Sequence, residues 1–536
     1  MRVNYLQLSN ILSFKYEEDI NSAFKIEFDP DLNIIIGENG SGKSTVLEAM
    51  NFIFTRALFK RITNRYSSHR SYYTDRKNML QIDDNYSNRK LGLRLQPNWS
   101  SEEEQQRVRV SIKLDSIDRA NIAHIVANYS HIKNTLDNYS IIPIPEFFAL
   151  DSDMDIEIDI IFKQAKYDED NTYKSYYNDS VPGYIKFYLE YYHAINEAIT
   201  VYNEDNTDHV APLGNTFSML SAFRDYSNYN SQIHLYNGDG SSGDTLQNAK
   251  NRLIPHSINE HSSGMPAIFD FIKLKLGEDH FNLVKEGKNI NDATAIINGS
   301  SIIKKINEKL RILNLQLSVK PVNIRRWSYE FRFQDTKNNR ELGDINNLSA
   351  GQKSILHLIF EAYGQGELKG GLIIIDEPEI HLHYQFQSEY LKILEELADK
   401  QGIQCILVTH SEGFISNKTI EHVKRFSLDE ERNSVAYAPE ITEDQKGLIK
   451  ILNNTQAARV LFLNKVLLVE GQDDEYFFRD VVKRLQPEFS QNINIKRSIA
   501  LDNVQKIADA LEIEPYLLFI EKLEKKKRGM FKNERL

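Results

Sequence analysis

Residues 37–45 of the sequence, Gly-Glu-Asn-Gly-Ser-Gly-Lys-Ser-Thr, have the composition of a loop that holds a phosphate group. The glycines allow positive φ, so that successive backbone N–H groups can turn toward an anion. Lys43 adds a positive charge beside the phosphates, and the Ser44 hydroxyl is a ligand for Mg²⁺. The candidate phosphate-binding residues are therefore Gly37, Glu38, Asn39, Gly40, Ser41, Gly42, Lys43, Ser44 and Thr45.

The residues on either side of this loop predict how it is held. The apolar run Ile34–Ile36 before it predicts a buried parallel strand. After it, apolar residues recur with helical spacing at Val46, Leu47, Met50 and Phe54. The order strand, loop, helix places the loop at a helix N-terminus, where the partial positive charge favours an anion.

A second group of polar residues follows two further apolar runs. Leu372–Ile375 ends in Asp376 and Glu377, and Cys405–Val408 is followed by His410. The carboxyl ends of parallel strands form the ligand site of an open α/β sheet. We expect Asp376 to hold Mg²⁺ through water, Glu377 to polarise an attacking water, and His410 to reach the γ-phosphate. The alternative for His410 is an ordinary satisfied polar residue.

The segment Leu348-Ser349-Ala350-Gly351-Gln352-Lys353 precedes an apolar helix predicted at 355–360. In chain order, the four motifs resemble those of the ABC-type ATPases of the SMC and OLD group, over residues 1–115 and 321–440. The resemblance implies ATP and Mg²⁺ as cofactors. It also implies that the signature residues Ser349, Gly351 and Gln352 complete the ATP site of a second subunit, so that two heads dimerise. Ala350 stands where the family usually has glycine, and Gln81 is only a guess for the glutamine loop.

The expected fold is α/β: an ABC-type, SMC-like P-loop ATPase head with a compact α+β insertion and a truncated Toprim-like C-terminal tail. The predicted ranges are 1–115 (N-lobe with the P-loop), 116–320 (insertion), 321–440 (C-lobe), 441–463 (linker) and 464–536 (tail). Strand-like patterns occur at 3–8, 24–28, 91–95, 107–114, 155–162 and 184–192. Helical patterns occur at 267–276 and 302–313, and residues 237–244 predict a loop.

The tail resembles the opening of a Toprim domain, the nuclease module fused to OLD ATPases. Glu470 and Asp474 match the first acidic pair of that module, but no D-x-D follows Asp474, and the corresponding stretch at 516–524 has Glu521-Lys522-Leu523-Glu524. We therefore expect a degenerate Toprim-like tail without its own nuclease activity. A minor alternative is that Leu501–Phe519 forms the last helices of a helix-turn-helix regulator.

Composition limits the partners and the compartment. The net charge of −11 argues against binding DNA over the whole surface. A basic segment interleaved with tyrosines, between Arg56 and Lys77, is either a solvated helix end and loop or a local nucleic-acid contact. We expect a cytoplasmic protein, since no apolar run approaches the ~18 residues that span a bilayer and the sequence has a single cysteine, Cys405.

These observations lead to one main hypothesis and two alternatives. Within its group the chain is most similar to the ATPases of Septu and retron antiphage systems, whose partner is an HNH nuclease. The hypothesis is a regulatory or sensor ATPase that controls such a nuclease, with contact to phage DNA or retron RNA–DNA and none to a membrane. The alternatives are an OLD-family nuclease with an unusual Toprim site and an SMC-like DNA-repair ATPase, although no long heptad repeat supports the latter.

Overall fold

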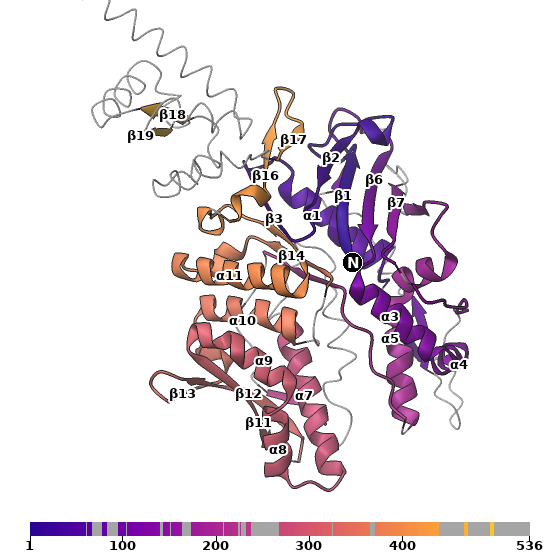
Figure 1. Cartoon of the computed structure of the whole chain (residues 1–536), viewed down its shortest axis with the longest axis vertical. Coiled ribbons are helices and arrows are strands. Elements are labelled where there is room, and N and C mark those ends of the chain that lie inside the picture. Colours follow the sequence, from indigo (N-terminus) through magenta and orange to yellow (C-terminus); the bar gives the residue numbers. More distant parts are fainter. Residues whose placement is uncertain are drawn as a thin grey trace, which may run out of the picture. The chain divides into compact units, whose positions relative to one another are not determined.

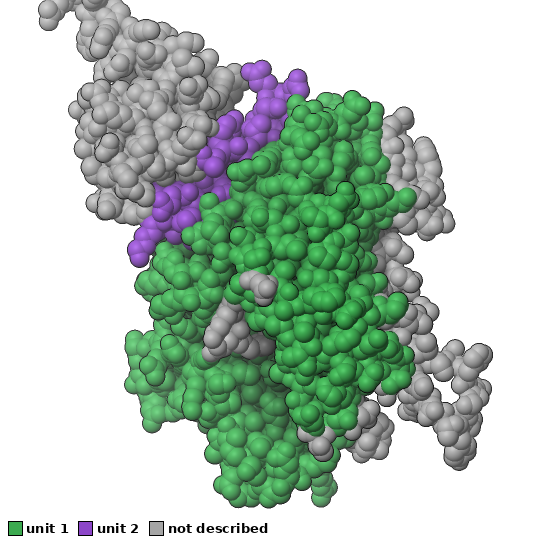
Figure 2. Space-filling view, turned by 45° about the vertical axis from the view of Figure 1, so that its right-hand side comes forward, with its two compact units in different colours: residues 1–31, 44–406 green, residues 32–43, 407–536 purple. Residues whose placement is uncertain are grey.

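The computed structural model describes residues 1–60, 62–66, 78–82, 95–102, 104–139, 143–150, 152–162, 173–206, 208–222, 226, 232–236, 267–323, 325–364, 370–416, 418–438, 466–469 and 494–497. The chain divides into two compact units, coloured separately in Figure 2. Unit 1 contains residues 1–31 and 44–406, and unit 2 contains residues 32–43 and 407–536. Each unit is described by itself below.

An antiparallel sheet in unit 1 has the strand order β2-β1-β6-β7-β8. The first four of these strands are labelled in Figure 1. The strands are β1 (Arg2–Ser9), β2 (Phe24–Glu27), β6 (Gln106–Lys113), β7 (Asp155–Phe162) and β8 (Tyr173–Tyr177). In β7 every second side chain is buried, from Ile156 to Phe162, so one face of the sheet covers the core. The predicted strands at 3–8, 24–28, 107–114 and 155–162 are confirmed. Since β7 and β8 belong to the same sheet as β6, this sheet crosses the predicted boundary at residue 115.

Three helices of unit 1 are connected to this sheet along the chain. α3 (Ser116–Ala127) and α4 (Tyr129–Tyr139) lie between β6 and β7 in the sequence, and α5 (Gly183–Asp205) follows β8. The strand predicted at 184–192 is wrong, because these residues form the first half of α5. Ile185, Tyr188, Leu189 and Tyr192 are buried at positions i, i+3, i+4 and i+7, which is one face of a helix. The aromatic and β-branched residues of this segment favour a strand. Burial of the helical face in the tertiary structure outweighs that preference, so the segment is a helix.

A second part of unit 1 contains a parallel strand pair and an antiparallel group. β9 (Phe217–Leu220) pairs in parallel with β14 (Leu372–Asp376). β12 (Ser328–Asp335) pairs with β10 (Gln232–His234), β11 (Leu315–Asn323) and β13 (Arg340–Gly343). The helices of this part are α7 (Ala267–Lys285), α8 (Ile290–Asn298), α9 (Ser301–Leu310), α10 (Ala350–Tyr363) and α11 (Tyr384–Gln401). α10 packs against α7, α9 and α11 (Figure 1), and the helices predicted at 267–276 and 302–313 are confirmed.

Unit 2 is built around β3 (Leu32–Gly37), all of whose residues are buried. β3 pairs in parallel with β16 (Val423–Leu428), which pairs antiparallel with β17 (Ser434–Tyr437). The strand β15 (Gln404–Val408) begins in unit 1 and ends in unit 2, where Thr409 N–H donates to Ile35 O at 3.0 Å. β18 (Val466–Val469) and β19 (Asn494–Arg497) form a separate parallel pair.

The remaining elements are α1 (Lys43–Phe52), which runs into a π-helical turn at Ile53–Ala57, and the hairpin of β4 (Ile62–Tyr66) and β5 (Asn78–Ile82). No helix in the described part of the chain combines the length and apolar character that crossing a bilayer requires. Several predictions lie outside the described residues: the strand at 91–94, the loop at 237–244, the linker 441–463, the acidic pair Glu470 and Asp474, and the segments 501–519 and 516–524.

Candidate nucleotide-binding site

The loop between β3 and α1 has the backbone that an anion site requires. Gly37, Gly40 and Gly42 have φ values of 147°, 81° and 93°, which side-chain-bearing residues rarely adopt. Asn39 and Gly40 are exposed, and no atom lies within 4 Å of a Cβ built on Gly40. The predicted positive φ angles are therefore confirmed, and the tip of the loop opens to solvent.

Lys43 begins α1 and folds back over this loop. Its side chain is 4% exposed, and Nζ donates to Gly37 O at 3.0 Å and to Glu38 O at 2.7 Å. A lysine is seldom buried to this degree without paired partners. The ammonium is thus held inside the loop, where it fits a nucleotide phosphate. Ser44 and Thr45 follow in the first turn of α1, half-buried and buried respectively.

His410 lies in unit 2 with the phosphate-binding loop. It is exposed and directly follows Thr409, whose N–H bonds to β3; Ser411 N–H donates to Thr409 Oγ1 at 3.0 Å. β15 runs parallel to β3, since Cys405 N–H donates to Asp31 O and Thr409 N–H donates to Ile35 O. His410 therefore lies just beyond the end of β15, and Gly37 ends the neighbouring parallel strand β3, at the same edge of the sheet.

Asp376 and Glu377 end the buried strand β14 in unit 1. Asp376 is 2% exposed, and Glu377 has φ 43° and ψ 59°, the left-handed region. For a non-glycine residue this conformation costs about 1–2 kcal/mol, and such residues concentrate at functional sites. Pro378 follows and starts a 3-10 turn that ends at His381. The strained backbone turns the chain sharply at Glu377, as expected of a residue that presents its side chain at a strand tip.

The signature segment forms the N-terminus of α10 in unit 1. Ser349 Oγ accepts from Gln352 N–H at 3.3 Å, and Gln352 Oε1 accepts from Ser349 N–H at 2.9 Å, a capping box. Ser349 and Ala350 are exposed, whereas Gly351 is buried. A Cβ at Gly351 would lie 3.4 Å from His381 O, so the signature packs closely on the turn that follows Glu377.

The structure also reveals buried polar contacts of α10 that the sequence analysis did not predict. Glu361 accepts from Ser218 Oγ at 2.6 Å, His357 Nδ1 lies 3.1 Å from Tyr226 Oη, and Lys353 Nζ donates to Tyr226 O at 3.1 Å. Lys353, His357 and Glu361 recur every four residues in a helix that is mostly apolar after Ser354, and this spacing is the signal that could have identified them. These contacts fix the position of α10, whose N-terminus carries the signature segment.

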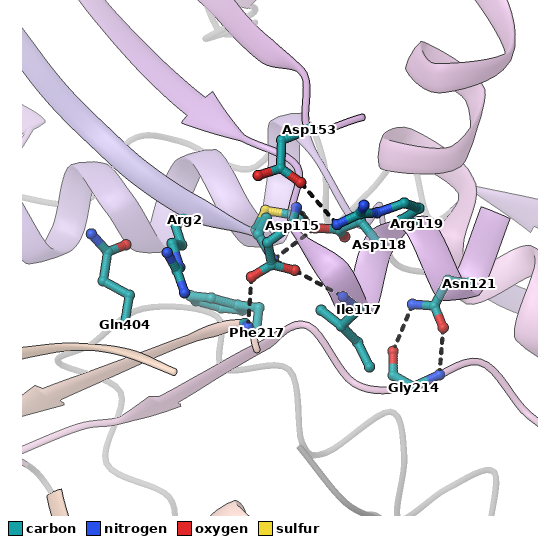
Figure 3. Close-up of polar contacts among 12 residues, drawn as sticks. Arg2, Asp115, Ile117, Asp118, Arg119, Asn121, Asp153, Gly214, Phe217 and Gln404 are labelled. Carbon is teal, nitrogen blue, oxygen red and sulfur yellow. Dashed lines mark hydrogen bonds and ion pairs between the residues drawn. The ribbon is translucent and has the colours of Figure 1, made fainter. Parts of the chain in front are cut away.

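A second missed group surrounds Asp115, the N-cap of α3 (Figure 3). Its carboxylate accepts from Ile117 N–H at 3.1 Å and from Gly371 N–H at 3.0 Å, and it pairs with the Met1 ammonium at 3.1 Å. Burial alone would raise the pKa of Asp115, but the Met1 ammonium and the Gly371 N–H outweigh it and lower the pKa. Gly371 directly precedes β14, so Asp115 anchors the strand that carries Asp376.

The described residues also bear on metal binding and on nucleic-acid contact. The described ranges contain no group of three or more His, Cys, Asp or Glu side chains that could hold a metal. The magnesium ligands expected from the sequence, Ser44 and Asp376, would act together with the phosphates of the nucleotide. In the basic segment, Arg56 is buried and Lys60 pairs with Glu190, so these two residues have structural roles. Gln81 lies on β5, and the basic residues from Arg70 to Lys77 fall outside the described ranges.

Comparison with known proteins gives two kinds of match. The chain is 37% identical over 132 residues to a protein called "OLD nuclease" from Thermus scotoductus, which is 23% of this chain and about a quarter (25%) of that relative. Among solved structures it is similar to an SMC head bound to the C-winged helix domain of ScpA (TM-score 0.39, 12% identity, 82% of this chain and 98% of that chain). It is also similar to the SMC head domain from Thermotoga maritima (TM-score 0.35, 11% identity, 82% of this chain and 100% of that chain). Likeness at these scores is distant.

The match to a protein family is more extensive. Residues 19–415, most of the chain, match the AAA ATPase domain family (AAA_15). The match includes the phosphate-binding loop, the signature segment, Asp376, Glu377 and His410. The chain belongs to the AAA ATPase domain family, and it is an ATPase.

Proposed function

We propose that ATP binds between two copies of this chain, with the phosphate-binding loop of one copy and the signature segment of the other on either side. The observation that carries this proposal is the exposed N-terminus of α10, with Ser349 and Ala350 open to solvent. A helix N-terminus carries partial positive charge and free N–H groups, which favour a phosphate. An anion-binding end that faces outward suits a nucleotide held by a second subunit.

Each predicted residue has a distinct role in hydrolysis. The backbone N–H groups of the loop and Lys43 bind the phosphates. Ser44 and Asp376 would hold Mg²⁺, whose charge offsets that of the phosphates when it is bound. Glu377 orients the attacking water and takes its proton, and His410 donates to the γ-phosphate. Since Glu377 acts only on the reacting water, its loss should affect turnover far more than binding.

The ATPase cycle, we propose further, regulates a separate effector nuclease in antiphage defence. This proposal takes up the resemblance of the sequence motifs to PtuA, the ATPase of Septu and retron systems, whose partner is an HNH nuclease. The sequence after Asp474 contains no D-x-D, and Lys522 lies between two acids where a metal would need carboxylates. The chain would then act in the cytoplasm as a sensor, in contact with phage DNA or retron RNA–DNA.

A mixing experiment tests the two-subunit site. Ser349→Arg and Lys43→Ala should each abolish ATP turnover alone. In a mixed dimer one composite site combines both defects, and the other combines two intact halves. Turnover should therefore return, up to about a quarter of the wild-type rate per chain if half the dimers are mixed. No recovery, under conditions where labelled subunits demonstrably exchange, would refute the shared site.

The relative named "OLD nuclease" favours a second candidate, a nuclease with an unusual Toprim site. The two candidates differ in what the purified chain does to DNA and RNA with Mg²⁺ or Mn²⁺. The regulatory proposal expects ATP turnover without cleavage. Cleavage that is lost in Glu470→Ala would establish the nuclease instead. Deleting residues 464–536 should release a nuclease partner and leave ATP turnover largely intact under the first candidate only.

A further inference from the structure

Within unit 2, the hairpin of β16 and β17 contacts the phosphate-binding loop from the side. β16 pairs with β3 up to Gly37, which lies opposite Phe426 in the register. A Cβ on Gly37 would lie 2.2 Å from Phe426 O, so the backbones meet more closely than any side chain would allow. The hairpin therefore fixes where the loop leaves the sheet.

Glu38 extends this pairing beyond the end of β3. Its Oε1 accepts from Leu428 N–H, two residues after Phe426, at 2.9 Å. Alternate N–H groups of β16 point toward β3, and at Leu428 the backbone of β3 has already turned into the loop. The Glu38 carboxylate thus replaces the missing backbone acceptor and ties the start of the loop to the hairpin.

Ser434, directly opposite Leu428 in the hairpin, holds the other side of the loop. Its Oγ donates to Ser41 O at 2.8 Å, and both residues are buried. The peptide between Ser41 and Gly42 is planar and trans, so its C=O and N–H point in opposite directions. Because Ser434 holds the carbonyl toward the hairpin, the Gly42 N–H is turned away from the hairpin.

We propose that Glu38 and Ser434 are positioning residues that hold the loop in its phosphate-binding conformation before ATP arrives. The inference rests on the proposed ATP site and assigns to two side chains a role that the G-x-x-x-x-G-K-S pattern does not contain. A loop that already has this shape need not be ordered when the nucleotide binds. Losing the preformed shape should therefore weaken ATP binding more than it slows ATP hydrolysis.

The test measures KM and kcat for ATP with the full chain. One hydrogen bond to a carboxylate and one between neutral groups suggest a KM raised about 10-fold in Glu38→Ala and about 3-fold in Ser434→Ala, with kcat within about twofold of wild type. Ser434→Thr keeps the hydroxyl and should stay near the wild-type KM, and Glu38→Gln keeps an acceptor oxygen and should raise KM less than Glu38→Ala does. Glu430→Ala, which removes an exposed carboxylate from the same hairpin, is the matched control.

The variants Glu38→Ala and Glu38→Gln distinguish an effect of charge on KM from an effect of hydrogen bonding. Both remove a negative charge near the phosphates, so a purely electrostatic effect would lower KM equally in both. Amide exchange at Leu428 gives a second readout: it should be faster in Glu38→Ala than in Glu38→Gln. An unchanged KM in Glu38→Ala and Ser434→Ala, or equal effects of Ala and Gln at Glu38, would overturn the inference. If Glu38→Ala does not fold, Ser434→Ala and Ser434→Thr decide. Retained ATP binding in Lys43→Ala would instead refute the proposed site itself.

Discussion

Replacing Asp115 with alanine should loosen β14, the strand that ends in the proposed metal-binding and catalytic carboxylates, Asp376 and Glu377. The Asp115 side chain is 8% exposed and bonds to three groups from separate parts of unit 1: Ile117 N–H, Gly371 N–H and the Met1 ammonium (Figure 3). Asp115→Ala removes all three contacts at once. The Gly371 N–H, at the start of β14, loses its acceptor in a buried position.

The magnitude follows from these contacts. Loss of an N-cap costs about 1 kcal/mol, and a buried N–H without an acceptor costs about 1–3 kcal/mol. Removing one partner of a buried ion pair usually destabilises a protein by more than either of these losses. In Asp115→Ala, however, the Met1 ammonium still pairs with Asp118 at 2.7 Å, so loss of the Asp115–Met1 pair adds little to the total. The total is about 3 kcal/mol. Asp115→Asn retains one acceptor oxygen and should lose about half as much.

Urea unfolding followed by tryptophan fluorescence measures this change, because both tryptophans, Trp99 and Trp327, belong to unit 1. Amide exchange at Leu372 should also become faster, by about 100-fold if opening of β14 becomes easier by the full amount. Asp153→Ala is the matched control: this exposed aspartate pairs with Arg119 at 3.0 Å, a surface ion pair worth about 0–1 kcal/mol. Equal effects of Asp115→Ala and Asp153→Ala would refute the anchoring role of Asp115.

Further predictions concern catalysis, cysteine reactivity and acid stability. Lys43→Ala should abolish ATP binding, whereas Glu377→Gln should bind ATP normally and hydrolyse it about 10²–10⁴-fold more slowly, as measured by nucleotide binding and turnover; wild-type turnover would remove Glu377 from its role. Burial raises the pKa of the Cys405 thiol to about 12, so a thiol reagent at pH 8 should label it only on unfolding, and rapid native labelling would contradict its burial. The hydrogen bond from Lys309 lowers the pKa of Glu396. The stabilising effect of this contact is present above the unfolded pKa of about 4.3 and is lost as pH falls through the lower folded pKa. Glu396→Gln should therefore lose stability at pH 7 and match wild type once the pH lies below the folded pKa, as measured by pH-dependent unfolding.

The sequence by itself determined the features that depend on neighbouring residues. The strand, glycine loop and helix around Gly37–Thr45, and the aliphatic strand that ends at Asp376, are contiguous segments whose period and composition select one local structure. The positive φ angles of the glycines follow from the same local pattern. Local composition does not determine the structure of residues 184–192. Their composition favours a strand, yet they form a helix in which one face is buried against the rest of the protein.

Only the tertiary structure decided which distant groups meet. Asp115 and Gly371 are 256 residues apart, and Glu38 and Leu428 are 390 residues apart. Each of these bonds joins a side chain to a backbone N–H, and every non-proline residue carries such a donor, so no residue type marks the partner. The choice depends on strand register and on which elements are adjacent, and those are set by burial of the apolar faces of the whole chain.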